Sequence, residues 1–151
     1  MSASDSRTPR IPRSVMRRAA ARKIALQALY GWQLNPAPWQ DLFAETLEHE
    51  NAAAADRDYL QALLQGICTA IDTLDADIAA WGDAPPGGID PVERAALLIG
   101  LHELRNQPEV PFKVAISEAV GLARRFGATD GHNFVNAVLD RAARELRPHE
   151  R

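Results

Sequence analysis

Basic residues are concentrated in the first 23 positions of this 151-residue chain. Seven arginines and lysines stand there against Asp5 alone, a net charge of +6, so the other 128 residues must sum to −9 within the overall −3. Arginine and lysine displace condensed counterions from a phosphate backbone, which produces salt-dependent affinity for nucleic acid. A basic end on an acidic body therefore predicts a nucleic-acid-binding segment. Its candidate phosphate contacts are Arg13, Arg17, Arg18 and Arg22.

Aromatic side chains would supply the second part of RNA recognition, because unstacked bases are held on aromatic rings. The basic segment itself contains no aromatic residue. The candidates lie further along the chain, and each could instead pack in the core: Tyr30, Trp32, Trp81 and Phe134. Core packing is the favoured interpretation for Trp32, whereas Tyr30 and Phe134 are balanced between the two roles.

Residues suited to catalysis or metal binding do not form a recognisable pattern. No two histidines have the i, i+4 spacing of a helical metal site, since they are scattered at His49, His102, His132 and His149. The single cysteine, Cys68, excludes a disulfide scaffold and a cysteine-based zinc cluster, and we expect it to be a small buried hydrophobe. The sequence therefore predicts a protein that is not an enzyme and uses neither a cofactor nor a metal.

The N-terminal composition also has targeting interpretations. A segment rich in arginine and serine and poor in acids is typical of a mitochondrial transit peptide, which stays an alternative. A twin-arginine signal at Arg17-Arg18 is excluded, because Arg22, Lys23 and Gln27 interrupt the apolar stretch that it requires. The apolar runs are too short to span a bilayer, and the cysteine content is typical of a reducing compartment. We expect a cytoplasmic protein.

Helical periodicity begins at Ser14, which is the predicted N-cap of a first helix reaching about Gln33. A second helix should begin near Pro38, since proline suits the first position of a helix. Apolar residues then alternate in steps of three and four over residues 60–81. This spacing predicts one long third helix with a continuous apolar seam, packed within the molecule.

A break at residues 82–89, rich in glycine and proline, separates the first half of the chain from the second. Asp90 and Pro91 then form a helix start, with aspartate as the cap and proline in the first turn. The helix that follows, to about Asn106, is apolar on two faces. We expect it to lie buried at the centre of the protein.

Two more helices complete the expected fold, one from Pro111 to Gly127 and one from about Thr129 or Asp130 to Leu146. The predicted fold class is all-α, with six or seven helices in two antiparallel subdomains. These are residues 14–81 and 90–151, joined by the linker at 82–89 and preceded by a disordered basic arm over residues 1–13.

Residues 110–143 form a distinctive block that includes Arg-Arg-Phe-Gly-Ala-Thr-Asp-Gly-His-Asn-Phe-Val-Asn at 124–136. This block strongly resembles the bacterial transcription antitermination factors of the NusB family. Residues 22–33 are similar to the first helix of that family, and Asp-Pro-Val-Glu-Arg-Ala at 90–95 with Glu-Leu-Arg-Asn at 103–106 to its fourth. The resemblance covers about residues 14–147.

The resemblance implies an all-helical protein that binds the boxA segment of nascent RNA as a heterodimer with NusE, a ribosomal small-subunit protein. It also implies loading onto the RNA polymerase antitermination complex and read-through of terminators, notably in ribosomal RNA operons. Relatives resemble monomers or homodimers, and both states stay open. The alternatives are an RNA-binding helical domain related to that of a ribosomal RNA cytosine methyltransferase, and an interaction scaffold that binds no RNA.

Carried over by position, Arg18 and Arg22 match the arginine-rich start of the family, and Tyr30 matches an aromatic residue near RNA. The chain departs from the family at Ala19 and Ala20, where some members have further arginines, while Arg7, Arg10, Arg13 and Arg17 extend the charge upstream. We therefore expect the positive footprint to be redistributed toward the N-terminal arm.

The remaining site residues implied by the resemblance lie beyond the first helix. Trp81 falls where relatives can carry a tyrosine, and Asp130 and Phe134 match the start of the last helix, where the RNA surface continues. Glu93 matches the fourth-helix region near the RNA and partner surfaces, and we expect it to bind the partner.

Overall fold

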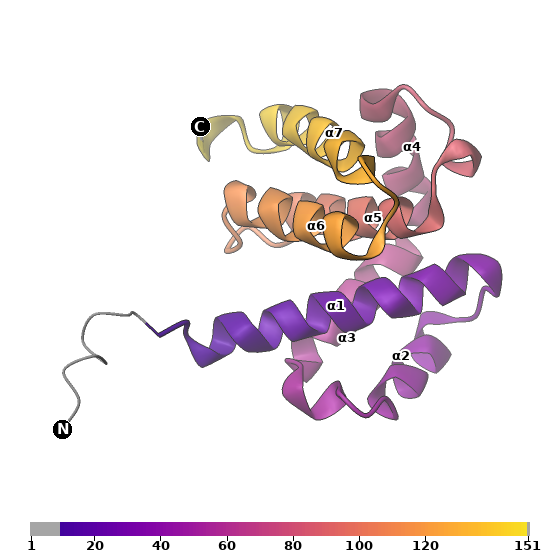
Figure 1. The fold of residues 1–151 in the computed structure, drawn as a ribbon, viewed down its shortest axis with the longest axis vertical. Coiled ribbons are helices and arrows are strands. Elements are labelled where there is room, and N and C mark those ends of the chain that lie inside the picture. Colours follow the sequence, from indigo (N-terminus) through magenta and orange to yellow (C-terminus); the bar gives the residue numbers. More distant parts are fainter. Residues whose placement is uncertain (1–9, 151) are drawn as a thin grey trace.

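The structure, a computed structural model, describes residues 10–150 and consists of helices stacked around a central one (Figure 1). The seven α-helices of this part of the chain are α1 (Arg13–Leu34), α2 (Trp39–Leu47), α3 (Arg57–Thr69), α4 (Ile71–Gly82), α5 (Pro91–Asn106), α6 (Phe112–Phe126) and α7 (Gly131–Leu146). Short 3₁₀ turns are η2 (Ala52–Ala54), η3 (Pro86–Gly88) and η4 (Pro148–Glu150). The all-α prediction is confirmed. Most of the predicted N-terminal arm, residues 1–9, lies outside the described residues.

The first helix begins differently from its prediction. Pro12, rather than Ser14, precedes the first helical residue, and its carbonyl accepts from the backbone N–H groups of Val15 and Met16 at 3.1 and 3.2 Å. Proline fixes its own backbone angle in the extended conformation that ends the preceding segment, so Ser14 lies inside the first turn. Arg13, which was predicted to belong to the arm, is the first residue of α1.

The single long helix predicted over residues 60–81 is wrong, because the chain breaks at Ala70 into α3 and α4. Ala70 has φ −110° and ψ 21°, outside the helical region. Just before it, the Thr69 hydroxyl donates to the carbonyl of Gln65 at 2.7 Å, a local bond that competes with regular helix geometry. Both pieces pack on α5, but their other neighbours differ: α3 packs on α1 and α2, whereas α4 packs on α7. A straight helix could not have reached both sets of neighbours.

Helix α5 is the buried centre, as the two apolar faces of its sequence predicted. Every residue from Ala95 to Leu104 is buried. Helices α1, α3, α4, α6 and α7 all pack against it, and Figure 1 shows it covered from several sides. The described residues therefore share one apolar core, to which both halves of the chain contribute.

The contact between α3 and α5 depends on a glycine. A Cβ atom built on Gly66 would lie 2.2 Å from Cε1 of His102, so only glycine allows the imidazole to lie against α3. Burial lowers the pKa of His102 to about 4, which leaves the ring neutral near pH 7. His102 is consequently a packing residue and not part of the positive charge of the protein.

Because α5 is shared by both halves, we expect the chain to unfold in one cooperative transition. A fragment of residues 90–151 would expose the faces of α5 that α1 and α3 cover, and it should not melt cooperatively. Thermal unfolding followed by circular dichroism and by tryptophan fluorescence would check this. Two separated transitions, or a cooperative melt of the fragment, would show instead that the two halves are independent.

Candidate nucleic-acid interface

The start of α1 is held against the start of α3 through two arginines. Nη2 of Arg17 donates to the carbonyl of Ala55 at 3.1 Å, and the backbone N–H of Asp56 donates to the carbonyl of Arg17 at 3.0 Å. The guanidinium carbon of Arg18 lies 4.3 Å from the centre of the Tyr59 ring, within the range of a cation–π contact. Among the described residues, no carboxylate lies within 4.0 Å of the side chains of Arg13, Arg17 or Arg18. Their positive charges therefore remain available at this end of the molecule.

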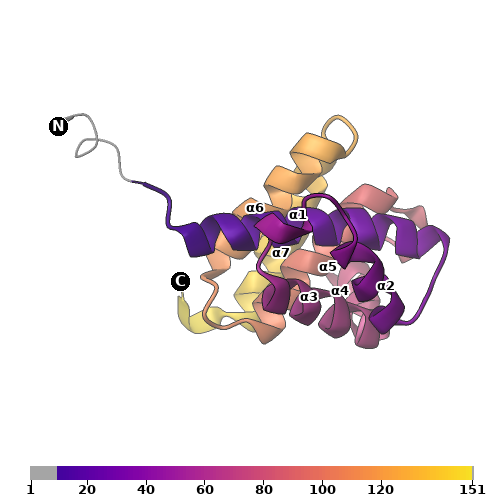
Figure 2. The same cartoon turned by 90° about the horizontal axis from the view of Figure 1, so that it is seen from below.

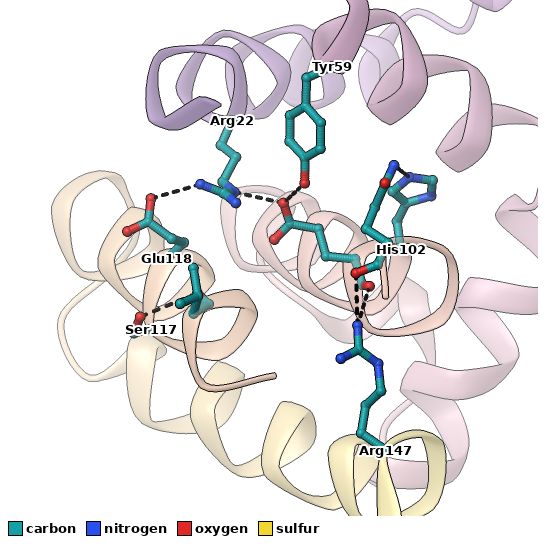
Figure 3. Close-up of polar contacts among 9 residues, drawn as sticks. Arg22, Tyr59, His102, Ser117, Glu118 and Arg147 are labelled. Atoms are coloured by element: carbon teal, nitrogen blue, oxygen red, sulfur yellow. Dashed lines mark hydrogen bonds and ion pairs between the residues drawn. The ribbon is translucent and has the colours of Figure 1, made fainter. Parts of the chain in front are cut away.

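Arg22 has a different position from the other predicted arginines, because it is buried and only 4% exposed. Its Nε lies 2.7 Å from Oε2 of Glu103, which is fully buried in α5, and its Nη1 lies 3.3 Å from Oε1 of Glu118 in α6 (Figure 3). The predicted RNA contact by Arg22 conflicts with this geometry, since its charge is already matched inside the protein. We assign Arg22 to the joint between α1, α5 and α6.

Tyr59 completes the polar cluster around Glu103. Its hydroxyl donates to the same carboxylate oxygen that Arg22 contacts, and Figure 3 shows Arg22 and Tyr59 converging on that oxygen. Burial and the Glu103 charge both raise the pKa of Tyr59, which stays a neutral donor. Burial alone would lower the pKa of Arg22, but the Glu103 carboxylate raises it above its usual value. The cluster thus joins an obligate cation, a carboxylate and a neutral hydroxyl.

The far end of α1 lies beside the start of α5. Nε2 of Gln33 donates to the carbonyl of Pro91 at 2.8 Å, and Nη1 of Arg94 donates to Oε1 of Gln33 at 3.1 Å. Tyr30, one turn earlier on α1, is 42% exposed. Twelve residues separate Tyr30 from Arg18, about 18 Å along the helix axis. An extended ligand could therefore reach both, whereas a single nucleotide could not.

Phe134 and Trp81 are half-buried where α4 and α7 meet. The ring of Phe134 approaches within 3.1 Å of the position that a Cβ atom on Gly82 would take, so part of the ring packs against the end of α4. The carbonyl of Trp81 accepts a hydrogen bond of 2.7 Å from Nη1 of Arg141. Both rings combine packing with partial exposure, and Tyr30 is more accessible than either of them.

Asp130 and Glu93 lie at the junction of α5 and α7. Asp130 is exposed and has a left-handed backbone with φ 69° directly before α7. Glu93 is only 9% exposed, and a Cβ atom on Gly131 would lie 2.0 Å from its Oε2, so any larger residue at position 131 would require the Glu93 side chain to move. Burial, and then the nearby Asp90 charge, raise the pKa of Glu93. The structure thus places Glu93 of α5 next to the start of α7, beside Asp130.

Asp90 caps α5 as predicted. Its Oδ2 accepts from the backbone N–H groups of Val92 and Glu93 at 3.0 and 3.2 Å, and Pro91 occupies the first turn. The cap fixes where α5 begins, and with it the position of Glu93.

Sequence reasoning missed three residues that organise this region: Tyr59, Glu103 and Arg147. The role of Glu103 could have been predicted, because a carboxylate inside a helix that is apolar on both faces requires a buried partner. Nothing in the sequence around Tyr59 or Arg147 indicated their roles. Arg147 is buried and donates to backbone carbonyls at the end of α5, including those of Leu104 at 2.8 Å and Gln107 at 2.9 Å. It thereby satisfies acceptors that a helix end leaves open.

The described residues offer little for catalysis or metal binding. Within residues 10–150, no three or more His, Cys, Asp or Glu side chains are arranged to hold a metal ion. Burial raises the pKa of Cys68 to about 11, which disfavours a reactive thiolate. None of the helices in this part of the chain combines the length and apolar character needed to cross a membrane.

Comparisons with known proteins agree on one family. The model of the NusB family matches residues 19–144. The chain is 43% identical over 138 residues to transcription antitermination protein NusB of Hahella chejuensis, covering 91% of this chain and 93% of that protein. It is 42% identical over 131 residues to the protein of the same name from Idiomarina loihiensis, covering 87% and 94%.

Two solved structures share the fold. A NusB structure from T. maritima aligns with a TM-score of 0.73 at 25% identity, over 91% of this chain and 94% of that one. A chain in the crystal structure of antitermination factors NusB and NusE in complex with dsRNA aligns with a TM-score of 0.75 at 26% identity, over 85% and 96%.

The burial of Arg22 leads to a prediction about stability. Arg22→Ala should lower the free energy of unfolding by about 3–5 kcal/mol, because it leaves the Glu103 carboxylate buried without its cation. Arg18→Ala removes the same charge from a more accessible position on the same helix and should cost no more than about 1 kcal/mol. Urea unfolding of both variants measures the difference. Similar small losses for the two would contradict a structural role for Arg22.

Proposed function

The chain belongs to the NusB family of non-enzymatic transcription antitermination factors, and from that premise we propose that it binds boxA RNA together with the ribosomal protein NusE. In this proposal the pair joins the RNA polymerase antitermination complex in the cytoplasm and promotes read-through, notably in ribosomal RNA operons. A similar chain has been crystallised with NusE and dsRNA, which supports both RNA and NusE as partners.

The observation that carries the proposal is the set of uncompensated arginines at the start of α1. Arg17 and Arg18 are fixed against α3 without carboxylate partners among the described residues. Fixed cations lose little conformational entropy on binding and can neutralise backbone phosphates. Arg13 extends the same positive end by one helical turn.

Recognition of bases would fall to the other end of α1. Tyr30 is the exposed ring there, and a base can stack on it because every base has a π-face. Trp81, Asp130 and Phe134 surround the junction of α4 and α7, with Glu93 beside it at the start of α5. We propose that the RNA strand runs from the arginines towards this junction and that NusE docks around Glu93.

A basic partner is expected for an electrostatic reason. Outside its first 23 residues the chain carries a net charge of −9, so one short positive end supplies most of the attraction for RNA. NusE docked around Glu93, beside the far end of α1, would continue the positive track beyond the reach of the arginines. Binding linkage then requires RNA to tighten the protein pair by the same factor by which NusE tightens RNA.

Titration of labelled boxA RNA with and without saturating NusE tests this proposal. We expect tighter binding with NusE and weaker binding of scrambled boxA. Arg18→Gln should reduce the slope of log K against log salt by about 0.7, the loss of one phosphate contact on a single strand. Arg144→Gln is the matched control, since Arg144 is paired with Asp140 on α7. Equal affinities with and without NusE, and for boxA and scrambled RNA, would contradict the proposed function.

Tyr30 and Phe134 should respond differently to truncation. Tyr30→Ala should weaken RNA binding by about 1–3 kcal/mol, the range measured for base stacking, with little change in stability, because the ring is exposed. Phe134→Ala should also lower the free energy of unfolding by more than about 1 kcal/mol, because its packing against α4 is lost. Paired RNA titrations and urea melts separate the two effects. Full RNA affinity in Tyr30→Ala would remove Tyr30 from the binding surface.

A further inference from the structure

A second group of uncompensated cations lies away from the start of α1. Lys23 on α1 and Arg124 and Arg125 in the last turn of α6 have no carboxylate within 4.0 Å among the described residues. This distinguishes them from the arginines of the described chain that are matched by acids, namely Arg22, Arg94, Arg105, Arg144 and Arg147. Unmatched positive charge is therefore present on two helices that are far apart in sequence.

A groove between α1 and α6, which we call the α1–α6 groove, brings Lys23 and Arg125 together. It has a volume of about 300 Å³ and is lined by Ala19, Ala20 and Lys23 from α1 and by Glu118, Gly121, Leu122 and Arg125 from α6. Figure 2 shows α6 crossing behind α1, with the carboxy-terminal part of α6 emerging beyond it. The small side chains in the lining keep the groove open between the two cations.

The two cations converge on one aromatic ring. Nζ of Lys23 lies 5.9 Å from the centre of the Phe126 ring, and the guanidinium carbon of Arg125 lies 5.0 Å from it. The shared ring and the shared groove lining bring an ammonium and a guanidinium from different helices into the same neighbourhood. Like charges in one neighbourhood repel each other, so an anion bound between them would relieve that repulsion.

Glu118 is the one acid in the lining of the groove. Its Oε1 lies 3.3 Å from Nη1 of the buried Arg22, while 39% of its side chain stays exposed. The lining thus carries two cations and one carboxylate, and that carboxylate has a cation on the side away from the groove. The groove keeps a positive character despite this carboxylate.

We propose that the α1–α6 groove holds a backbone phosphate of the bound RNA strand, contacted by Lys23 and Arg125; this inference rests on the proposed function. Lys23 and Tyr30 are seven residues apart on α1, which is two helical turns and places them on the same face about 10 Å apart. A strand with a base on Tyr30 would therefore pass the groove. Guanidinium and ammonium groups are the usual protein partners of phosphate oxygens.

The helix dipole is an alternative reason for basic residues in the last turn of α6, because cations interact favourably with the carboxy-terminal end of a helix. The test therefore needs a control that removes basic residues from outside the groove. Arg124 and Arg125 share the last turn of α6, but only Arg125 lines the groove. Lys113 lies in the first turn of the same helix, exposed and outside the groove lining. The double variant Lys113→Gln/Arg124→Gln therefore changes the net charge as much as Lys23→Gln/Arg125→Gln does, but leaves the groove intact.

The test is titration of boxA RNA with the full chain and these two double variants, at several salt concentrations. Loss of the groove pair should lower the salt slope by about 0.7 and weaken binding about five-fold at 0.1 M salt, the counterion term for one phosphate. The control pair should change the affinity less than two-fold. Glu118→Gln keeps an oxygen that can accept from Arg22 but removes the negative charge, and it should tighten binding. Melting curves would verify that all variants are folded.

The outcomes separate this inference from the proposed function. If the unmodified chain binds RNA and both double variants lose equal affinity, the effect is one of overall charge and the groove proposal is overturned. A loss confined to titrations with NusE would also overturn it, because the groove would then contact the protein partner. If the unmodified chain retains no RNA in any titration, the proposed function fails first, and the groove proposal fails with it.

Discussion

The buried ion pair between Arg22 and Glu103 is the interaction on which the rest of the structure depends. Glu103 is fully buried in the central helix, where a carboxylate without a cation would cost several kcal/mol. Helix α1 supplies the cation and α3 supplies the hydroxyl of Tyr59. Three helices consequently meet at one carboxylate oxygen. Displacing α1 or α3 would remove a donor from Oε2 of Glu103, whose other oxygen, Oε1, is already buried without a hydrogen-bond partner among the described residues.

The same pair determines what the surface of α1 presents. Because Arg22 faces inwards, the helix is held in one rotation about its axis. Arg18 then lies over the ring of Tyr59, while Lys23 and Tyr30 lie on the outer face. Tyr59 therefore links interior and surface: its hydroxyl bonds to Glu103 and its ring carries Arg18. The interior electrostatics thus position the cations proposed to bind RNA.

The sequence by itself determined the fold class, the central position of α5 and the clustering of positive charge near the N-terminus. These properties follow from interactions between residues that are close together in sequence. The signals are the apolar periodicity, the Asp90 cap with Pro91, and the breaks rich in glycine and proline. The resemblance over residues 110–143 identified the family for the same reason, since it is a property of contiguous residues. The prediction of a continuous helix over residues 60–81 was wrong, because a heptad pattern does not show that the two ends of the segment pack on different neighbours.

Only the tertiary structure decided which charges are buried and which are free. Arg18 and Arg22 are one helical turn apart and equivalent in sequence, yet one lies over a ring and the other is paired with an acid 81 residues away. The convergence of Lys23 and Arg125 likewise requires α1 and α6 to cross. The physical reason is that the free energy of a charge depends on its surroundings in three dimensions, and those surroundings are supplied by residues far away along the chain.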